Sequence, residues 1–166
     1  MRMTDKYVFF WGRGCSFTNW HPCEFEVDGV RYNCSEQFLM AEKARMFNDT
    51  DTLREILASS DPRYQKACGR SVRGFNKGAW DAKARDIMYR GCHAKYSQNP
   101  DLKKELLSTG TRTIVEASPE DCIWGIGIHW KSELCDDPKN WRGTNWLGET
   151  LTKVRDDLAM NERGVA

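Results

Sequence analysis

The sequence predicts an α+β fold that is mostly helical, with five or six helices around one core, a small β-hairpin and a few short strands. The first observation is a series of segments rich in Leu, Met, Ala, Glu and Lys, bounded by residues that cap or break helices. The second is Asp28-Gly29, a strong signal for a two-residue hairpin turn. The length of 166 residues and the 40% hydrophobic content fit a single compact domain over 1–166, with its core at about 7–160.

The charge balance makes the protein nearly neutral. Its 25 basic and 24 acidic residues argue against a surface that coats a polyanion, but not against a pocket for one nucleotide. No apolar run reaches the length of a membrane span, roughly 20 residues, and the first residues lack the apolar core of a signal peptide.

The cysteine pattern favours reduced thiols. Seven cysteines form an odd set without a CxxC motif, so neither a disulfide framework nor a zinc knuckle is indicated. The three histidines are scattered along the chain. We therefore expect a cytoplasmic or nuclear monomer that uses no metal, no cofactor and no membrane.

The N-terminal part of the chain reads as strands and turns. The apolar run 7–11 predicts a buried strand, which Gly12-Arg13-Gly14 ends. Two glycines beside an arginine allow backbone and guanidinium to approach a phosphate, and an ordinary turn is the alternative. A polar-aromatic loop follows, and then strands at 24–27 and 30–33 form the predicted hairpin.

Residues 34–47 are predicted to form a helix, and two charged residues fall within its apolar face. No Gly or Pro interrupts it, and at about 100° per residue its apolar side chains share one broad stripe. That stripe contains Leu39, Met40, Ala44, Met46 and Phe47. Glu36 and Lys43 fall in the middle of it, about 20° apart by the same geometry. Burying either charge is costly unless it is paired or used, so both are candidates for function.

Each of these two charges also has an explanation without chemistry. If Asn33 is the N-cap, Glu36 is the third helical residue and forms a variant capping box. Lys43 can extend from the edge of the stripe and keep its ammonium in water. That both explanations hold at once is less probable than either one.

The rest of the chain alternates helices with irregular segments. Further helices are predicted at 52–59, 63–68, 80–96, 102–107 and 147–160, with a β-rich segment at 111–117 and loops at 74–78 and 131–143. Trp80 is by default a core anchor of its helix. The segment 118–121 has the residues of a helix start, but the alternating glycines after it do not continue a helix. We therefore expect Asp121 at a one-turn corner, before glycines that suit the approach of a flat ligand to Trp124.

The unusual residues together fit a polar, cyclic substrate. They are Glu36, Lys43, Trp80, Asp121 and Trp124. An indole stacks on a base, carboxylates serve as general acid and base or stabilise an oxocarbenium-like sugar, and a desolvated amine attacks a sugar aldehyde carbon. These residue types also permit many other hydrolases, so they indicate only a nucleotide or sugar site.

The ordered series of short motifs resembles the NADAR family, also called YbiA-like. The matching motifs are Phe10-Trp11-Gly12, Phe17-Thr18-Asn19, Ser35-Glu36-Gln37-Phe38, Met40-Ala41-Glu42-Lys43-Ala44, Gly69-Arg70, Trp80, Met88, Lys95-Tyr96, Leu106-Leu107, Thr109-Gly110, Glu116-Ala117-Ser118-Pro119, Asp121, Trp124-Gly125-Ile126-Gly127 and Gly143-Thr144-Asn145-Trp146-Leu147-Gly148. They span about residues 8–158. The family commonly has Phe-Ser-Asn at the second motif, where Thr18 here keeps the hydroxyl. The segment between Asp121 and Asn145 looks variable in such proteins, so we expect substrate preference to lie there.

The resemblance implies an N-glycoside hydrolase that cleaves bonds between ribose and an amine nitrogen. The substrate we favour is ADP-ribose on the guanine amino group of a nucleotide or nucleic acid. The alternative is a ribosylamino-pyrimidine phosphate, an intermediate of riboflavin synthesis. The implied catalytic residues are Lys43, Glu36 and Asp121, and the implied substrate-binding residues are Gly12, Arg13, Phe17, Asn19, Trp80, Trp124, Gly125 and Asn145.

Two mechanisms and two other classes of protein stay open at this point. Lys43 forms a Schiff base with C1 of the opened ribose, which we place slightly ahead, or water adds directly to an oxocarbenium-like sugar. A module that binds ADP-ribose or NAD without catalysis would show binding and no turnover. A purely structural domain would bind no nucleotide at all.

Overall fold

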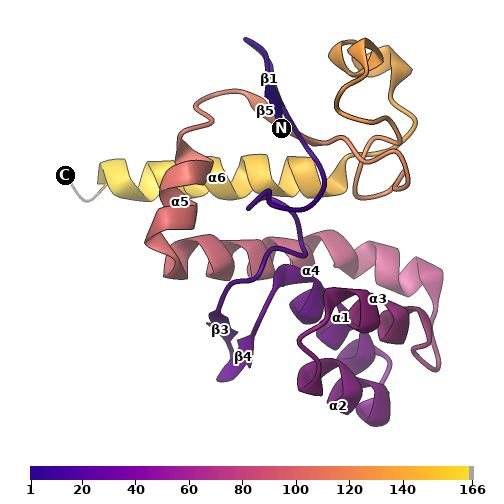
Figure 1. The fold of residues 1–166 in the computed structure, drawn as a ribbon. Coiled ribbons are helices and arrows are strands. Elements are labelled where there is room, and N and C mark those ends of the chain that lie inside the picture. Colours follow the sequence, from indigo (N-terminus) through magenta and orange to yellow (C-terminus); the bar gives the residue numbers. More distant parts are fainter. Residues whose placement is uncertain (165–166) are drawn as a thin grey trace. The chain divides into compact units, whose positions relative to one another are not determined.

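The structure is a computed structural model that describes residues 1–164 and contains two compact units. The helical unit is Asn19–Asn99, and the sheet unit combines Met1–Thr18 with Pro100–Ala166. Within the described residues there are six α-helices and five short strands (Figure 1). The predicted fold class, α+β and mostly helical, is confirmed. The single domain expected from the sequence stays a prediction.

The helical unit begins with the expected hairpin. Strands β3 (Phe25–Val27) and β4 (Val30–Tyr32) pair in antiparallel fashion. Asp28 and Gly29 both have positive φ, 51° and 78°, as the tight hairpin turn requires. The far end of the unit is attached to this hairpin, because the Gln98 side chain bonds both the backbone N and the backbone O of Glu26 at 2.8 Å.

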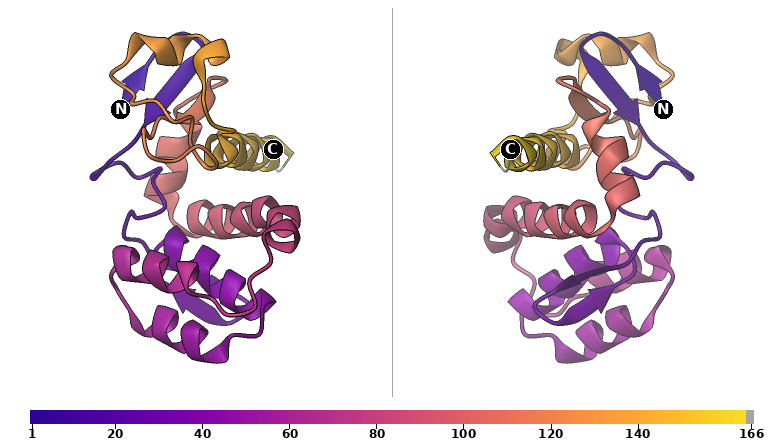
Figure 2. Two further views of the ribbon diagram at one scale, coloured as in Figure 1. Left: turned by 90° about the vertical axis from the view of Figure 1, so that its right-hand side faces the viewer. Right: turned by 90° about the vertical axis from the view of Figure 1, so that its left-hand side faces the viewer.

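Four helices form the rest of the helical unit, and α1 packs against the other three. They are α1 (Ser35–Met46), α2 (Thr50–Ala58), α3 (Pro62–Arg70) and α4 (Lys77–Gln98). Figures 1 and 2 show α4 running along one side of the group formed by α1, α2 and α3. The helices were expected at these places. Several begin earlier than predicted, because Asp49 and Asn76 accept hydrogen bonds as N-caps of α2 and α4.

Two glycines let α1 approach its neighbours closely. A Cβ atom on Gly69 of α3 would lie 1.9 Å from the sulfur of Met40, and one on Gly91 of α4 would lie 2.4 Å from the ring of Phe38. Met40 and Phe38 both come from α1 and are buried. Met40 thus packs α1 against α3, and Phe38 packs it against α4. These two contacts fix the orientation of the α1 face that carries Glu36 and Lys43.

The sheet unit has a three-stranded sheet in the order β1-β2-β5. Strand β2 (Tyr7–Phe10) pairs antiparallel with β1 (Arg2–Met3) and parallel with β5 (Thr113–Glu116), with Tyr7 opposite Thr113. Helix α5 is Pro100–Leu107, and α6 (Trp146–Gly164) packs on β5. The two-residue strand β1 was not predicted.

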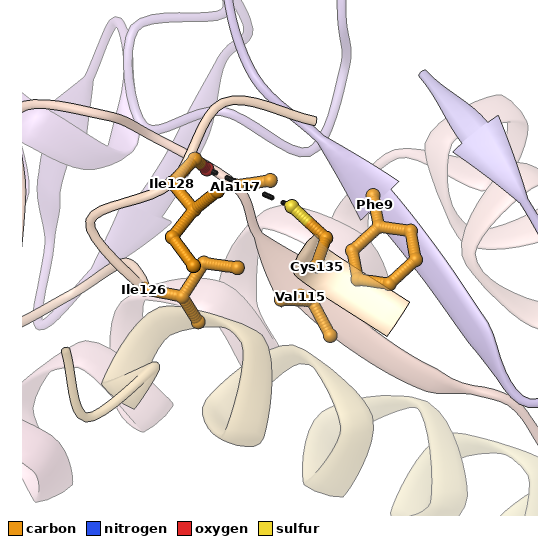
Figure 3. Close-up of a cluster of buried hydrophobic side chains, with 6 residues drawn as sticks. All are labelled: Phe9, Val115, Ala117, Ile126, Ile128 and Cys135. Carbon is orange, nitrogen blue, oxygen red and sulfur yellow. Dashed lines mark hydrogen bonds between the residues drawn. The ribbon is translucent and has the colours of Figure 1, made fainter. Parts of the chain in front are cut away.

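A core cluster lies beside β5 in the sheet unit (Figure 3). Its members are Phe9, Val115, Ala117, Ile126, Ile128 and Cys135. Cys135 belongs to the first of two short 3-10 helices, Glu133–Asp136 and Pro138–Asn140, in a segment predicted as loop. Its thiol lies within the cluster and contacts the carbonyl oxygen of Ile128 (Figure 3).

Candidate active site

The structure divides the predicted site residues between the two units. The helical unit holds Asn19, Glu36, Lys43 and Trp80. The sheet unit holds Gly12, Arg13, Phe17, Asp121, Trp124, Gly125 and Asn145. The residues of the two units are therefore described separately.

Glu36 is not the capping residue of α1. The N-cap is Cys34, whose sulfur accepts a hydrogen bond from the backbone N of Gln37 at 3.4 Å. The alternative in which Asn33 is the N-cap and Glu36 completes a capping box is therefore wrong. Gln37 is the third helical residue, and its side-chain oxygen reaches back to the backbone N of Asn33 at 2.8 Å. The reciprocal contact thus belongs to Gln37, and capping does not explain why Glu36 is only 6% exposed.

Asn19 holds the first turn of α1 from outside. Its backbone oxygen accepts a hydrogen bond from the backbone N of Glu36 at 2.9 Å. Its side-chain NH2 lies 3.6 Å from the sulfur of Met88 on α4. Asn19 therefore ties the beginning of α1 to α4, and by doing so fixes the backbone that carries Glu36.

The Lys43 ammonium lies against two aromatic rings. Its Nζ is 4.3 Å from the ring centre of Phe75 and 5.8 Å from that of Trp80. Burial lowers the pKa of Lys43, the negative charge of Glu36 opposes that effect, and the positive charge of Arg70 lowers the pKa further. A lysine that only extends into water does not need this environment. The amine is instead half-buried, with a pKa moved toward the range in which a lysine acts as a nucleophile.

Trp80 is both a buried core residue and a neighbour of Lys43. It is 8% exposed, as the core-anchor interpretation predicts, and it comes from the first turns of α4. Its ring nevertheless borders the Lys43 amine. Because little of the indole is accessible, its clearest effect in the structure is on the surroundings of Lys43.

Phe75 is the residue that the sequence interpretation missed. It lies in the loop between α3 and α4, is 44% exposed, and also packs against Phe47 with ring centres 5.5 Å apart. In the sequence it is only one aromatic residue in a predicted loop with glycines at its ends. No local pattern connects it with Lys43.

The loop that carries Phe75 is fastened to α2 by Asp49. The Asp49 carboxylate caps α2 and accepts hydrogen bonds from the backbone N and the guanidinium of Arg73, at 2.9 and 2.8 Å. These hydrogen bonds lower the pKa of Asp49, so the contact persists at neutral pH. Gly74 next to it has φ of 74°, which turns the chain toward Phe75.

In the sheet unit, Asp121 organises the corner expected from the sequence. Its Oδ1 accepts hydrogen bonds from the backbone N of Ile123 and of Trp124, both at 2.8 Å. No helix begins here. The carboxylate is partly exposed, and among residues 1–164 its Oδ2 has no hydrogen-bond partner. Trp124 is half-buried, with its ring centre 5.6 Å from that of Trp146.

Three of the predicted substrate-binding residues make their contacts inside the protein. A Cβ atom on Gly125 would lie 2.8 Å from the backbone oxygen of Glu116, so this glycine permits close packing of two chain segments. Asn145 is 2% exposed, and its side-chain amide bonds the backbone N of Glu116 and the backbone O of Ile114 at 2.9 and 3.1 Å. Phe17 is buried against Phe10.

The turn at Gly12-Arg13-Gly14 differs from these inward residues. Gly12 and Gly14 have φ of 91° and 84°, and a Cβ on either would meet no atom within 4 Å. Arg13 between them is exposed. The turn therefore presents open backbone and a guanidinium, as the phosphate interpretation requires.

Residues 1–164 contain neither a cluster suited to a metal ion nor a helix suited to a membrane. No group of three or more His, Cys, Asp or Glu side chains is placed to hold a metal ion. Among the described helices, none has the length and apolar character needed to cross a membrane.

The whole chain is similar to known proteins. The NADAR domain model matches residues 9–159. N-glycosidase R617 of Acanthamoeba polyphaga mimivirus is 42% identical, over 93% of this chain and 97% of that protein. Protein irg-1 of Caenorhabditis elegans is 39% identical, over 93% and 81%. The NMR structure of the Escherichia coli protein YbiA superimposes with a TM-score of 0.78 at 26% identity, covering 97% of this chain and 89% of that one.

Proposed function

The chain belongs to the NADAR domain family and has N-glycosidases among its relatives, so it is a hydrolase of N-glycosyl bonds, and we propose that it removes ADP-ribose from the guanine amino group of nucleic acid. One observation supports catalysis above all: the half-buried amine of Lys43 lies between Phe75 and Trp80, on the helix that also buries Glu36. A module that only binds a nucleotide needs no such amine.

The proposed reaction begins when the neutral amine of Lys43 attacks C1 of the opened ribose. The bond from C1 to the guanine nitrogen breaks, the nitrogen leaves with a proton, and a Schiff base joins C1 to Lys43. Water then adds to this carbon, the C1–lysine bond breaks, and the free sugar and the amine are regenerated. The lowered pKa of Lys43 supports this route, because it increases the fraction of neutral amine near pH 7.

Glu36 is the group we propose to accept and return the proton of Lys43. It is buried, and its charge interacts with Lys43 directly enough to oppose the lowering of that pKa. Asp121 in the sheet unit is proposed as a second proton carrier on the strength of the family resemblance. Its partnerless Oδ2 is consistent with such a role.

Product analysis with two substrates tests the proposal. Wild type, Lys43→Ala and the surface control Lys83→Ala are incubated with a guanine-ADP-ribosylated oligonucleotide and with a ribosylamino-pyrimidine phosphate. We expect wild type and Lys83→Ala, but not Lys43→Ala, to release ADP-ribose from the oligonucleotide. Cleavage of the pyrimidine substrate alone would assign the enzyme to metabolite clearance. Binding of ADP-ribose without any turnover would replace the proposal with a binding module.

Borohydride trapping separates the two mechanisms. Reduction during turnover converts a lysine imine into a stable secondary amine, which mass spectrometry locates by peptide. We expect the adduct on Lys43 and none in Lys43→Arg, since a guanidinium keeps the charge but forms no imine. Substantial activity of Lys43→Arg would instead favour direct attack by water.

A further inference from the structure

We infer that Arg70 binds a phosphate on the 5′ carbon of the substrate's ribose and so makes the enzyme selective for phosphorylated N-ribosides. The inference rests on the proposed function only in placing the ribose at Lys43. It names a residue outside the predicted site, and it states which part of the substrate that residue contacts.

The position of Arg70 follows from the way α3 meets α1. Arg70 is the last residue of α3, directly after Gly69. Gly69 is in contact with Met40, which lies four residues after Glu36 and three before Lys43, on the same side of α1. The Arg70 side chain therefore starts one residue from the point where α3 touches the α1 face that bears the amine and the carboxylate.

The charge of Arg70 is not neutralised by the protein. Arg70 is exposed, and within residues 1–164 it forms no ion pair and no hydrogen bond through its side chain. Nearby arginines behave differently: Arg73 pairs with Asp49 and Asp51 at 2.8 and 3.0 Å, and Arg45 pairs with Glu42 at 2.6 Å. An available guanidinium beside the candidate nucleophile is thus particular to Arg70 in this part of the helical unit.

Arg70 and Lys43 are like charges close enough to interact. The positive charge of Arg70 contributes to the lowered pKa of Lys43. Two neighbouring cations repel each other, and the negative charge of a phosphate relieves that repulsion. Arginine suits this task, because it stays charged at every relevant pH and its fork of N–H groups matches two phosphate oxygens. Lys43 can therefore lose its proton and act as the nucleophile, while Arg70 keeps its charge and binds the phosphate.

The chemical class of the ligand follows from the reaction. With C1 of the ribose at Lys43, the anion attached to that sugar in both proposed substrate classes is the group at C5. Both substrate classes considered above have a phosphate there, as the first phosphate of a diphosphate or as a monoester. The inference therefore predicts discrimination against the corresponding N-ribosides without a phosphate.

A comparison of two substrates in three proteins tests this subsite. For whichever substrate class the wild type cleaves, kcat/KM is measured with and without the 5′-phosphate, in wild type, Arg70→Gln and Arg63→Gln. Arg63 is an exposed arginine at the other end of α3 and serves as the matched control. We expect the preference for the phosphorylated substrate to fall about 10- to 100-fold in Arg70→Gln, mainly through KM, as one or two charge-assisted hydrogen bonds imply. Arg63→Gln should keep the wild-type preference, and Arg70→Lys should keep part of it.

An unchanged preference in Arg70→Gln would overturn the inference. If wild type cleaves neither substrate class, the proposed function fails, and calorimetric binding of ADP-ribose then decides about Arg70 separately. Weaker binding to Arg70→Gln than to Arg63→Gln supports the phosphate subsite. Equal binding, or no binding by any of the proteins, refutes it.

Discussion

The Lys43 face of α1 and the turn around Asp121 both attract attention in the sequence as polar residues in apolar surroundings, yet the structure uses their polar atoms differently. In the sheet unit, Asp121 and Asn145 bond backbone groups and hold the turn and β5 in place. In the helical unit, Gln37 makes the reciprocal contact at the start of α1, and Glu36, although buried, is not the residue that caps the helix. A buried polar group is therefore a stronger candidate for chemistry when a neighbour already satisfies the local backbone.

The largest effect that this comparison predicts is on the reaction rate. Lys43→Arg should lower kcat on the order of 10³-fold or more, as expected when a nucleophile is removed. Lys43→Met should do the same and also stabilise the fold, since the burial penalty of the ammonium disappears. The measurements are single-turnover kinetics and urea denaturation. A Lys43→Met protein that is inactive and less stable would place Lys43 with the structural residues.

The next effect is on stability and concerns the opposite region. Asn145→Ala should cost about 2–4 kcal/mol in the free energy of unfolding, because it leaves backbone groups of Glu116 and Ile114 without partners. Asn161→Ala, at an exposed asparagine near the end of α6, is the control and should change stability by about 0.5 kcal/mol or less. Equal unfolding midpoints for the two variants would show that the Asn145 amide is not structural.

A smaller effect is expected at the ring that covers Lys43. Phe75→Ala exposes the Lys43 amine to water, which raises its pKa and lowers the fraction of neutral amine, so kcat near pH 7 should fall about tenfold. Phe75→Tyr keeps the ring and should restore most of the rate. Asp49→Asn should resemble Phe75→Ala, because Asp49 holds the loop through Arg73. If the Asp49 variant were as fast as wild type, the loop would not depend on this contact.

The smallest predicted effect is a displacement of the pH profile. The rate should rise with pH as Lys43 loses its proton, with a midpoint below the ordinary lysine value because burial lowers its pKa. The Glu36 charge raises the pKa of Lys43, so Glu36→Gln should move the midpoint to lower pH, while Glu36→Asp should not. A midpoint that moves upward in Glu36→Gln would contradict the interaction.

The same pKa has a consequence for folding. Because the pKa of Lys43 is lower in the folded protein than in the unfolded chain, unfolding takes up a proton at pH values between the two. Stability contributed by this residue therefore rises as the pH increases through that interval. Lys43→Met removes this dependence, which denaturation curves at several alkaline pH values can measure.

Local chemistry was readable from the sequence, and contacts across the chain were not. Asp28-Gly29 specifies its turn through its own backbone preferences, so the predicted hairpin is confirmed. The helix predicted at 63–68 is found as α3, which Asp61 caps and Pro62 begins. Cys34 is an uncommon cap, which is why the pattern pointed to Asn33 instead. Strand β1 is two residues long and exists only through its pairing with β2.

The candidate site shows the same limit. The 3.6-residue period brings Glu36 and Lys43 to one face of a helix, so the sequence alone identifies that pair. Phe75 reaches Lys43 only because Asp49 fastens its loop, and no short-range signal records that contact. A glycine in the sequence indicates that another group comes close to the backbone, but not which group. At Gly125 that group is the protein's own backbone and not a ligand.

The parallel pairing of Tyr7 with Thr113 has a consequence during synthesis on the ribosome. Strand β2 emerges early and is almost entirely apolar, but its partner β5 is translated only after the whole helical unit. The last residues of the helical unit are hydrogen-bonded to its hairpin, so this unit can fold before β5 is made. During that time the edge of β2 that pairs with β5 stays unpaired. The nascent chain therefore passes through an interval in which the apolar strand β2 has not yet paired with β5.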